Sequence, residues 1–78
     1  MSTLRTRNVS LQGHRTSVRL EPALWEAFDE ICKLERKTRH ALCSEIAERR
    51  CVGGFTSALR VFILDYYRTL ASATRRAA

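Results

Sequence analysis

A short stretch at residues 15–20 constrains the fold most, because its side chains alternate in character. Its even-numbered positions carry threonine, valine and leucine, whereas its odd-numbered positions carry arginine, serine and arginine. Successive side chains of an extended segment point to opposite faces, so one face would be apolar and the other polar. Gly13 and Pro22 bracket the run. The pattern predicts a strand over residues 14–20 whose polar face presents Arg15, Ser17 and Arg19.

Such a strand needs a hydrogen-bonding partner along its edge, yet no second stretch of the chain alternates as clearly. Residues 1–13 are polar and carry arginines, and we interpret them as a flexible basic arm or as a terminus without a role. The partner strand would then come from a second copy of the chain, antiparallel about a twofold axis. We therefore expect an intertwined homodimer, with assembly into a higher oligomer left open.

Three helices are expected after the strand, which makes the fold class mainly α with one N-terminal β-strand. Pro22 suits a first helical position, and Thr38 suits the cap of a second helix. The paired glycines Gly53 and Gly54 predict a break before the third helix. The expected helices span about residues 22–36, 38–50 and 56–72 of a domain over residues 14–72, and residues 73–78 form a frayed tail.

Apolar residues recur along the first helix at spacings of three and four, which predicts the side that faces the core. Trp25 widens this stripe, and an aromatic residue on an apolar stripe is more often a core residue than a ligand-stacking one. The stripe contains Leu24, Phe28, Ile31 and Leu34.

Charge is unevenly spread along a chain whose net charge is +6. The first twenty residues carry four arginines and no acid, whereas five of the eight acidic residues lie within residues 21–35. A basic N-terminal segment backed by an acidic helix would direct a polyanion toward the strand.

The residues that could support catalysis or metal binding are too scattered to form a recognisable site. Cys32, Cys43 and Cys51 do not match the spacing of zinc ligands, and His14 and His40 stand apart from them. The sequence therefore predicts no enzyme, no metal, no cofactor and no small-molecule ligand. The odd number of cysteines disfavours a disulfide framework and, with no segment long enough to span a membrane, predicts a cytoplasmic protein.

The strand, the proline after it and the two helices parted by a short turn resemble the ribbon-helix-helix (Arc/MetJ-like) DNA-binding domain family. The resemblance covers roughly residues 15–50, and the third helix is similar to one found in some branches of the family. Family members often have glycine in the turn between the helices, where Arg36 and Lys37 stand here. We expect Lys37 to adopt the left-handed conformation that glycine would otherwise supply.

The resemblance implies a homodimer that binds double-stranded DNA, most simply as a transcriptional repressor of bacterial or phage type. A two-stranded ribbon fits the major groove, where its polar side chains would contact bases. The start of the second helix would hold a phosphate through its free backbone N–H groups. The implied base contacts are Arg15, Ser17 and Arg19, and the implied phosphate contacts are Thr38, Arg39, His40, Arg5 and Arg7.

Two alternatives to a repressor are left open. The chain could be an antitoxin whose C-terminal segment also masks a toxin, although little chain follows Arg68. It could also be a dimeric protein–protein assembly module that does not bind DNA. A strand that only dimerised would have no need of two arginines on its exposed face.

Overall fold

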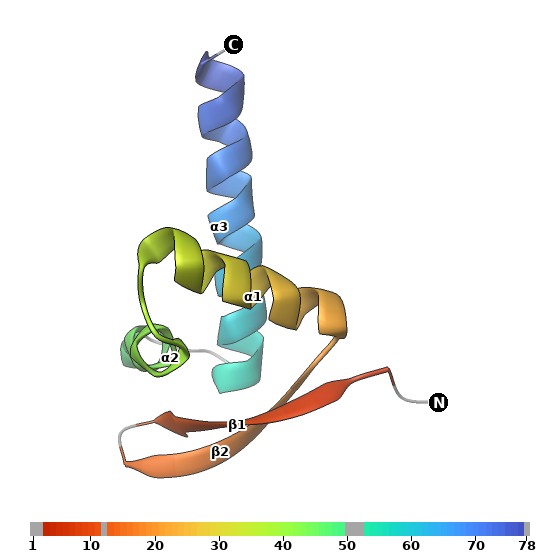
Figure 1. The fold of residues 1–78 in the computed structure, drawn as a ribbon, viewed down its shortest axis with the longest axis vertical. Coiled ribbons are helices and arrows are strands. Elements are labelled where there is room, and N and C mark those ends of the chain that lie inside the picture. Colours follow the sequence, from red (N-terminus) through yellow and green to blue (C-terminus); the bar gives the residue numbers. More distant parts are fainter. Residues whose placement is uncertain (1–2, 12, 50–52, 78) are drawn as a thin grey trace.

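The chain folds into a two-stranded antiparallel sheet followed by three helices (Figure 1). A computed structural model describes residues 3–11, 13–49 and 53–77. The elements are β1 (Arg5–Leu11), β2 (His14–Leu20), α1 (Pro22–Glu35), α2 (Arg39–Glu48) and α3 (Phe55–Ala77).

The expected strand forms as β2, but its partner lies in the same chain. β1 pairs with β2 over seven residue pairs, from Arg5 opposite Leu20 to Leu11 opposite His14. The interpretation of residues 1–13 as a flexible arm is therefore wrong for Arg5–Leu11, and β2 pairs with a strand of its own chain. Gly13 makes the tight connection possible, because its φ of 83° lies in the left-handed region that favours glycine.

The sequence did not predict β1 as a strand because its inward-facing side is not uniformly apolar. Its inward positions are Arg7, Val9 and Leu11, which are half-buried under the helices. Because arginine stands at inward position 7, Val9 and Leu11 alone do not give the alternation of apolar and polar residues that predicts a strand. The sequence signal that could have revealed β1 was the glycine connection between two short alternating runs.

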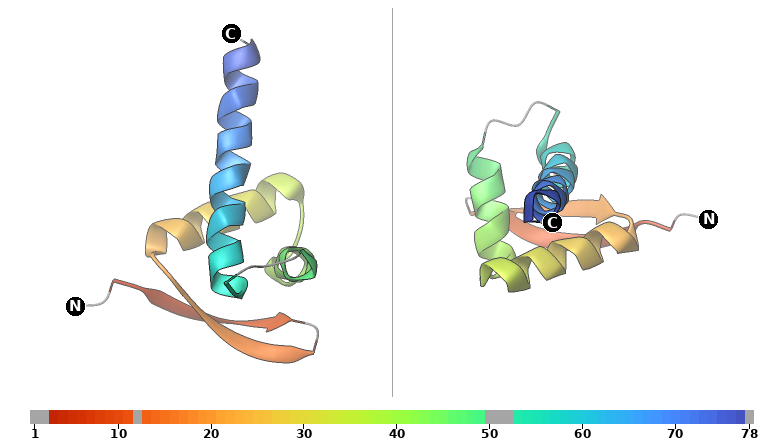
Figure 2. Two further views of the ribbon diagram at one scale, coloured as in Figure 1. Left: turned by 180° about the vertical axis from the view of Figure 1, so that it is seen from behind. Right: turned by 90° about the horizontal axis from the view of Figure 1, so that it is seen from above.

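The helical layer covers one face of the ribbon (Figures 1 and 2). α2 packs on β1, and α3 contacts both α1 and α2 before rising away from the ribbon. The buried side chains of the core include Val18, Leu20, Trp25, Phe28, Ile31, Leu42, Cys43, Ile46, Leu59 and Ile63. Trp25 is thus a core residue, as expected.

The core beneath the ribbon is closed within one chain. Val18 and Leu20, the apolar residues of β2, are no more than 1% exposed without a second copy. In the part of the chain that the structure describes, none of the large apolar side chains that stay exposed belongs to β1 or β2. These exposed residues are Leu4, Leu34, Val61, Leu64 and Leu70. Leu34, at 61% exposure, was wrongly placed in the inward stripe of the first helix.

The helix ends differ in detail from the sequence-based expectation. Arg36, not Lys37, takes the left-handed conformation after α1, with φ of 55°. Thr38 caps α2 as expected, because its Oγ1 accepts a hydrogen bond from the N–H of Ala41 at 3.0 Å. α2 ends at Glu48, and the expected end at residue 50 lies outside the described residues.

α3 is longer than its apolar pattern suggested. It continues to Ala77, so the tail predicted to fray from residue 73 is helical through residue 77. Alanine and arginine make up most of residues 73–77, and both have a high intrinsic helix propensity. Among the described residues, no helix combines the length and the apolar character needed to cross a membrane.

Candidate nucleic-acid interface

The outer face of the ribbon brings together the three residues that were expected to contact bases. Arg15, Ser17 and Arg19 are all exposed, since they alternate with the inward residues of β2. They lie on the side opposite the helices, so this face is open to a large partner (Figure 1). The sequence therefore placed the polar face of β2 correctly.

The other half of this face comes from β1, whose residues were not among the expected base contacts. Thr6 lies opposite Arg19, Asn8 opposite Ser17, and Ser10 opposite Arg15. The Ser17 hydroxyl donates a hydrogen bond of 2.8 Å to Oδ1 of Asn8 across the two strands. We define these six residues as the outer ribbon face: Thr6, Asn8, Ser10, Arg15, Ser17 and Arg19.

The start of α2 lies beside the ribbon, next to β1. The first N–H groups of a helix have no backbone partner within it, and the hydroxyl of Thr38 accepts a hydrogen bond from that of Ala41. The first turn of α2 holds no acidic residue. Arg39 and His40 line a surface depression of about 440 Å³ together with residues of β1. The full lining is Arg7, Asn8, Val9, Ser10, Trp25, Phe28, Arg39 and His40.

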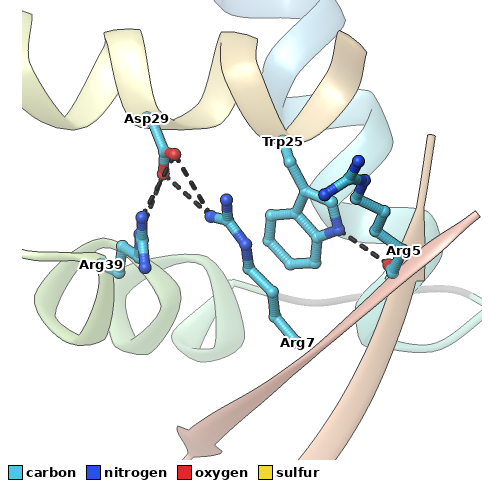
Figure 3. Close-up of polar contacts among 5 residues, drawn as sticks. All are labelled: Arg5, Arg7, Trp25, Asp29 and Arg39. Atoms are coloured by element: carbon cyan, nitrogen blue, oxygen red, sulfur yellow. Dashed lines mark hydrogen bonds and ion pairs between the residues drawn. The ribbon is translucent and has the colours of Figure 1, made fainter. Parts of the chain in front are cut away.

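Asp29 of α1 holds the arginines of two other elements (Figure 3). Nη1 of Arg7 lies 3.1 Å from Oδ1 of Asp29, and Nε of Arg39 lies 2.9 Å from the same oxygen. Partial burial would raise the pKa of Asp29, but the hydrogen bonds from Arg7 and Arg39 outweigh it and lower that pKa below its usual value. The carboxylate thus ties β1 and the start of α2 to α1.

Trp25 holds the N-terminal end of β1 against α1. Its Nε1 donates a hydrogen bond of 2.9 Å to the backbone oxygen of Arg5, while the Arg7 guanidinium stacks 4.7 Å from the ring centre (Figure 3). Arg7 is therefore half-buried against α1 rather than projecting freely, as the expected phosphate contact would. The side chain of Arg5 is exposed.

Two acidic side chains of α1 accept hydrogen bonds from tyrosines of α3. The hydroxyl of Tyr67 donates to Glu30, and that of Tyr66 to Glu35, each at 2.8 Å. Burial, followed by the hydrogen bond to Glu30, raises the pKa of Tyr67 to about 12. The acidic segment noticed in the sequence therefore serves partly to dock α3.

The cysteines of the described chain lack the features of a reactive or metal-binding site. Cys32 and Cys43 are buried, and burial raises the pKa of Cys43 to about 11, which disfavours the reactive thiolate. The described residues contain no group of three potential metal ligands. Cys51 lies outside the described residues.

Comparison with known proteins gives one family. The ribbon-helix-helix domain matches residues 4–67, which include both strands, α1, α2 and more than half of α3. The match therefore begins before β1 and covers the part of the chain that the sequence analysis had left as an arm. No curated protein and no solved structure matches the chain.

Proposed function

Because the chain belongs to the ribbon-helix-helix domain family, we propose that it binds double-stranded DNA through its outer ribbon face and regulates transcription. Members of this family commonly bind DNA as transcription regulators, and such domains are typically regulatory rather than enzymatic. The observation that carries the proposal is the exposure of two arginines on a ribbon whose other face is buried. A two-stranded ribbon has the dimensions of the DNA major groove.

Base contacts would come from the side chains of β2. The guanidinium groups of Arg15 and Arg19 can each donate two hydrogen bonds to O6 and N7 of guanine. The hydroxyl of Ser17 can donate or accept at several bases. These residues belong to a strand whose inward side chains are buried in the core, so the backbone would lose little conformational freedom on binding.

Phosphate contacts would come from the start of α2. The N–H groups of Arg39 and His40 would receive a phosphate at the positive end of the helix dipole, with Thr38 holding the turn in shape. The exposed guanidinium of Arg5 would add nonspecific attraction. Arg7 has a different role in this proposal: it positions β1 through Asp29 and Trp25.

Repression, a homodimer and a cytoplasmic, nucleoid-associated location also belong to this proposal. Family members generally form dimers, which supports association of two copies. Because β1 and β2 pair within one chain, each copy in such a dimer would bring its own ribbon.

Fluorescence anisotropy with labelled random duplex DNA tests the proposal. The protein should bind, and its affinity should fall by orders of magnitude between about 50 mM and 200 mM salt. Arg15→Ala and Arg19→Ala should each weaken binding, whereas Arg75→Ala, an equal loss of charge from the exposed part of α3, should change it little. Absence of salt-sensitive binding by a folded protein would refute the proposal.

An assembly module is the second candidate, because α3 leaves two neighbouring apolar side chains uncovered. Val61 and Leu64 are 54% and 57% exposed on the same side of the helix. This alternative predicts binding to a protein and none to DNA. The antitoxin alternative predicts DNA binding together with a second small protein that co-purifies.

A further inference from the structure

We infer that the ribbon of a single chain is a complete and asymmetric reading element, and that it recognises a DNA sequence that is not palindromic. The inference rests on the proposed function, since it assumes that the outer ribbon face enters the groove. It adds Thr6, Asn8 and Ser10 of β1 to the base-reading residues. It also assigns the central base pair of the site to the Asn8–Ser17 pair.

The first support is that one chain supplies both strands of the ribbon and the core that covers its inner face. All seven residues of β2 are paired with β1, so no position of β2 is left for a strand of another copy along that edge. The inner face is also complete, because Val18 and Leu20 are buried by helices of the same chain. A ribbon shared about a twofold axis would instead leave these residues partly uncovered in one copy.

The second support is the chemical difference between the two strands. In a ribbon formed by two copies, rotation by 180° would exchange identical side chains. Here Arg19 lies opposite Thr6, and Arg15 lies opposite Ser10. Both arginines of the outer ribbon face come from β2, and β1 contributes only uncharged groups to it. Such a surface presents different donors and acceptors to the two DNA strands.

The centre of the ribbon has a defined hydrogen-bonding polarity. Because the Ser17 hydroxyl donates to Oδ1 of Asn8, the Asn8 amide nitrogen keeps its two donors and the Ser17 oxygen keeps its acceptor capacity. Adenine offers the complementary pair in the major groove, an acceptor at N7 and a donor at N6. Asn8 would donate to N7, and Ser17 would accept from the N6 amino group.

The arginines on either side set the width of the site. Arg15 and Arg19 are four residues apart on one strand, which corresponds to about 13 Å along β2. At 3.4 Å per base pair this distance covers roughly four base pairs. We therefore expect two G·C pairs about that far apart, with an A·T pair between them and no twofold symmetry within this width.

Selection of bound sequences from a random duplex pool, followed by sequencing, tests the inference on the full chain. The wild-type protein should yield the asymmetric motif. Asn8→Ala should reduce the preference for the central A·T pair about tenfold while the preference for the flanking G·C pairs persists. Thr69→Ala, on the exposed side of α3, is the matched control and should leave the motif unchanged. Equal thermal midpoints would establish that both variants fold.

The outcomes separate this inference from the proposed function. A motif palindromic within the width of one ribbon, unchanged in Asn8→Ala, would overturn the inference while DNA binding stands. A repeat of the asymmetric motif would support it, since two chains side by side would each read one copy. Failure of the folded wild-type protein to enrich any DNA and to bind random duplex would overturn both.

Discussion

Arg39 at the start of α2 forms a two-pronged ion pair with Asp29 of α1. Its Nε donates to Oδ1 at 2.9 Å and its Nη2 donates to Oδ2 at 3.2 Å. Arg7 of β1 donates to both oxygens of the same carboxylate. One acidic side chain thus engages two arginines that a DNA phosphate would otherwise attract, and it joins the ribbon to the helix beside it.

Asp29→Asn should increase affinity for random duplex DNA several-fold. The amide would no longer compete with phosphates for Arg39, so about one more counterion should be released and the salt dependence should steepen by about one unit of slope. Fluorescence anisotropy at several salt concentrations measures both quantities. Glu26→Gln, which makes the same change of charge on α1, is the control. Equal effects of the two variants would show that Asp29 acts only through net charge.

Acid should weaken the fold partly through Asp29. Its pKa is lower in the folded protein than in the unfolded chain, so its contribution to stability is complete above the unfolded value of about 4. That contribution is lost as the pH falls through the lower folded value. Urea unfolding between pH 6 and pH 2 should therefore show a smaller loss of stability in Asp29→Asn than in the wild type. Parallel curves for the two proteins would argue against this ion-pair contribution.

Leu20→Asp should unfold the protein, whereas Arg19→Asp should not. Leu20 is fully buried beneath the ribbon, and an unpaired charge there would cost about 3–5 kcal/mol. Arg19 is the exposed neighbour on the other face of β2. Circular dichroism during heating distinguishes the two variants. A cooperative, undiminished transition in Leu20→Asp would mean that the faces of β2 are assigned the wrong way round.

Arg19→Ala and Arg39→Ala should impair DNA binding in different ways. Loss of a base contact should cost about 1–3 kcal/mol on the preferred site and relax the preference at one position. Because Asp29 already neutralises part of the charge of Arg39, loss of that guanidinium should weaken binding to all sequences alike and reduce the salt slope by less than one unit. Competition binding with preferred and random duplexes measures the difference. If Arg39→Ala changed the sequence preference and Arg19→Ala did not, α2 rather than the ribbon would be the reading element.

The sequence predicts correctly those parts of the fold in which a residue's own chemistry and its immediate neighbours determine whether it is buried or exposed. Thr16, Val18 and Leu20 define the inward face of β2 because β-branched and apolar side chains alternate with polar ones. Thr38 reveals the start of α2, since its hydroxyl can satisfy a free N–H of the first turn. Such local signals need no knowledge of the partner element.

β1 could not be found in the same way because its inward position 7 depends on residues far along the chain. Arg7 is tolerated there only because Trp25 supplies an aromatic face and Asp29 supplies a carboxylate. Both residues come from α1, so nothing near Arg7 in the sequence indicates that it faces inward. The same dependence explains why Asn8 was overlooked: its role on the outer ribbon face follows only from its register with Ser17.

Amide chemical shifts during titration with a short duplex test most directly the claim that the outer ribbon face binds DNA. The largest changes should fall on β1, β2 and the first turn of α2, with Asn8, Ser17 and His40 among them. Val61 and Leu64, which are exposed on α3, should change little, because this account assigns them no DNA contact. Changes concentrated on α3, with the ribbon unaffected, would contradict the account.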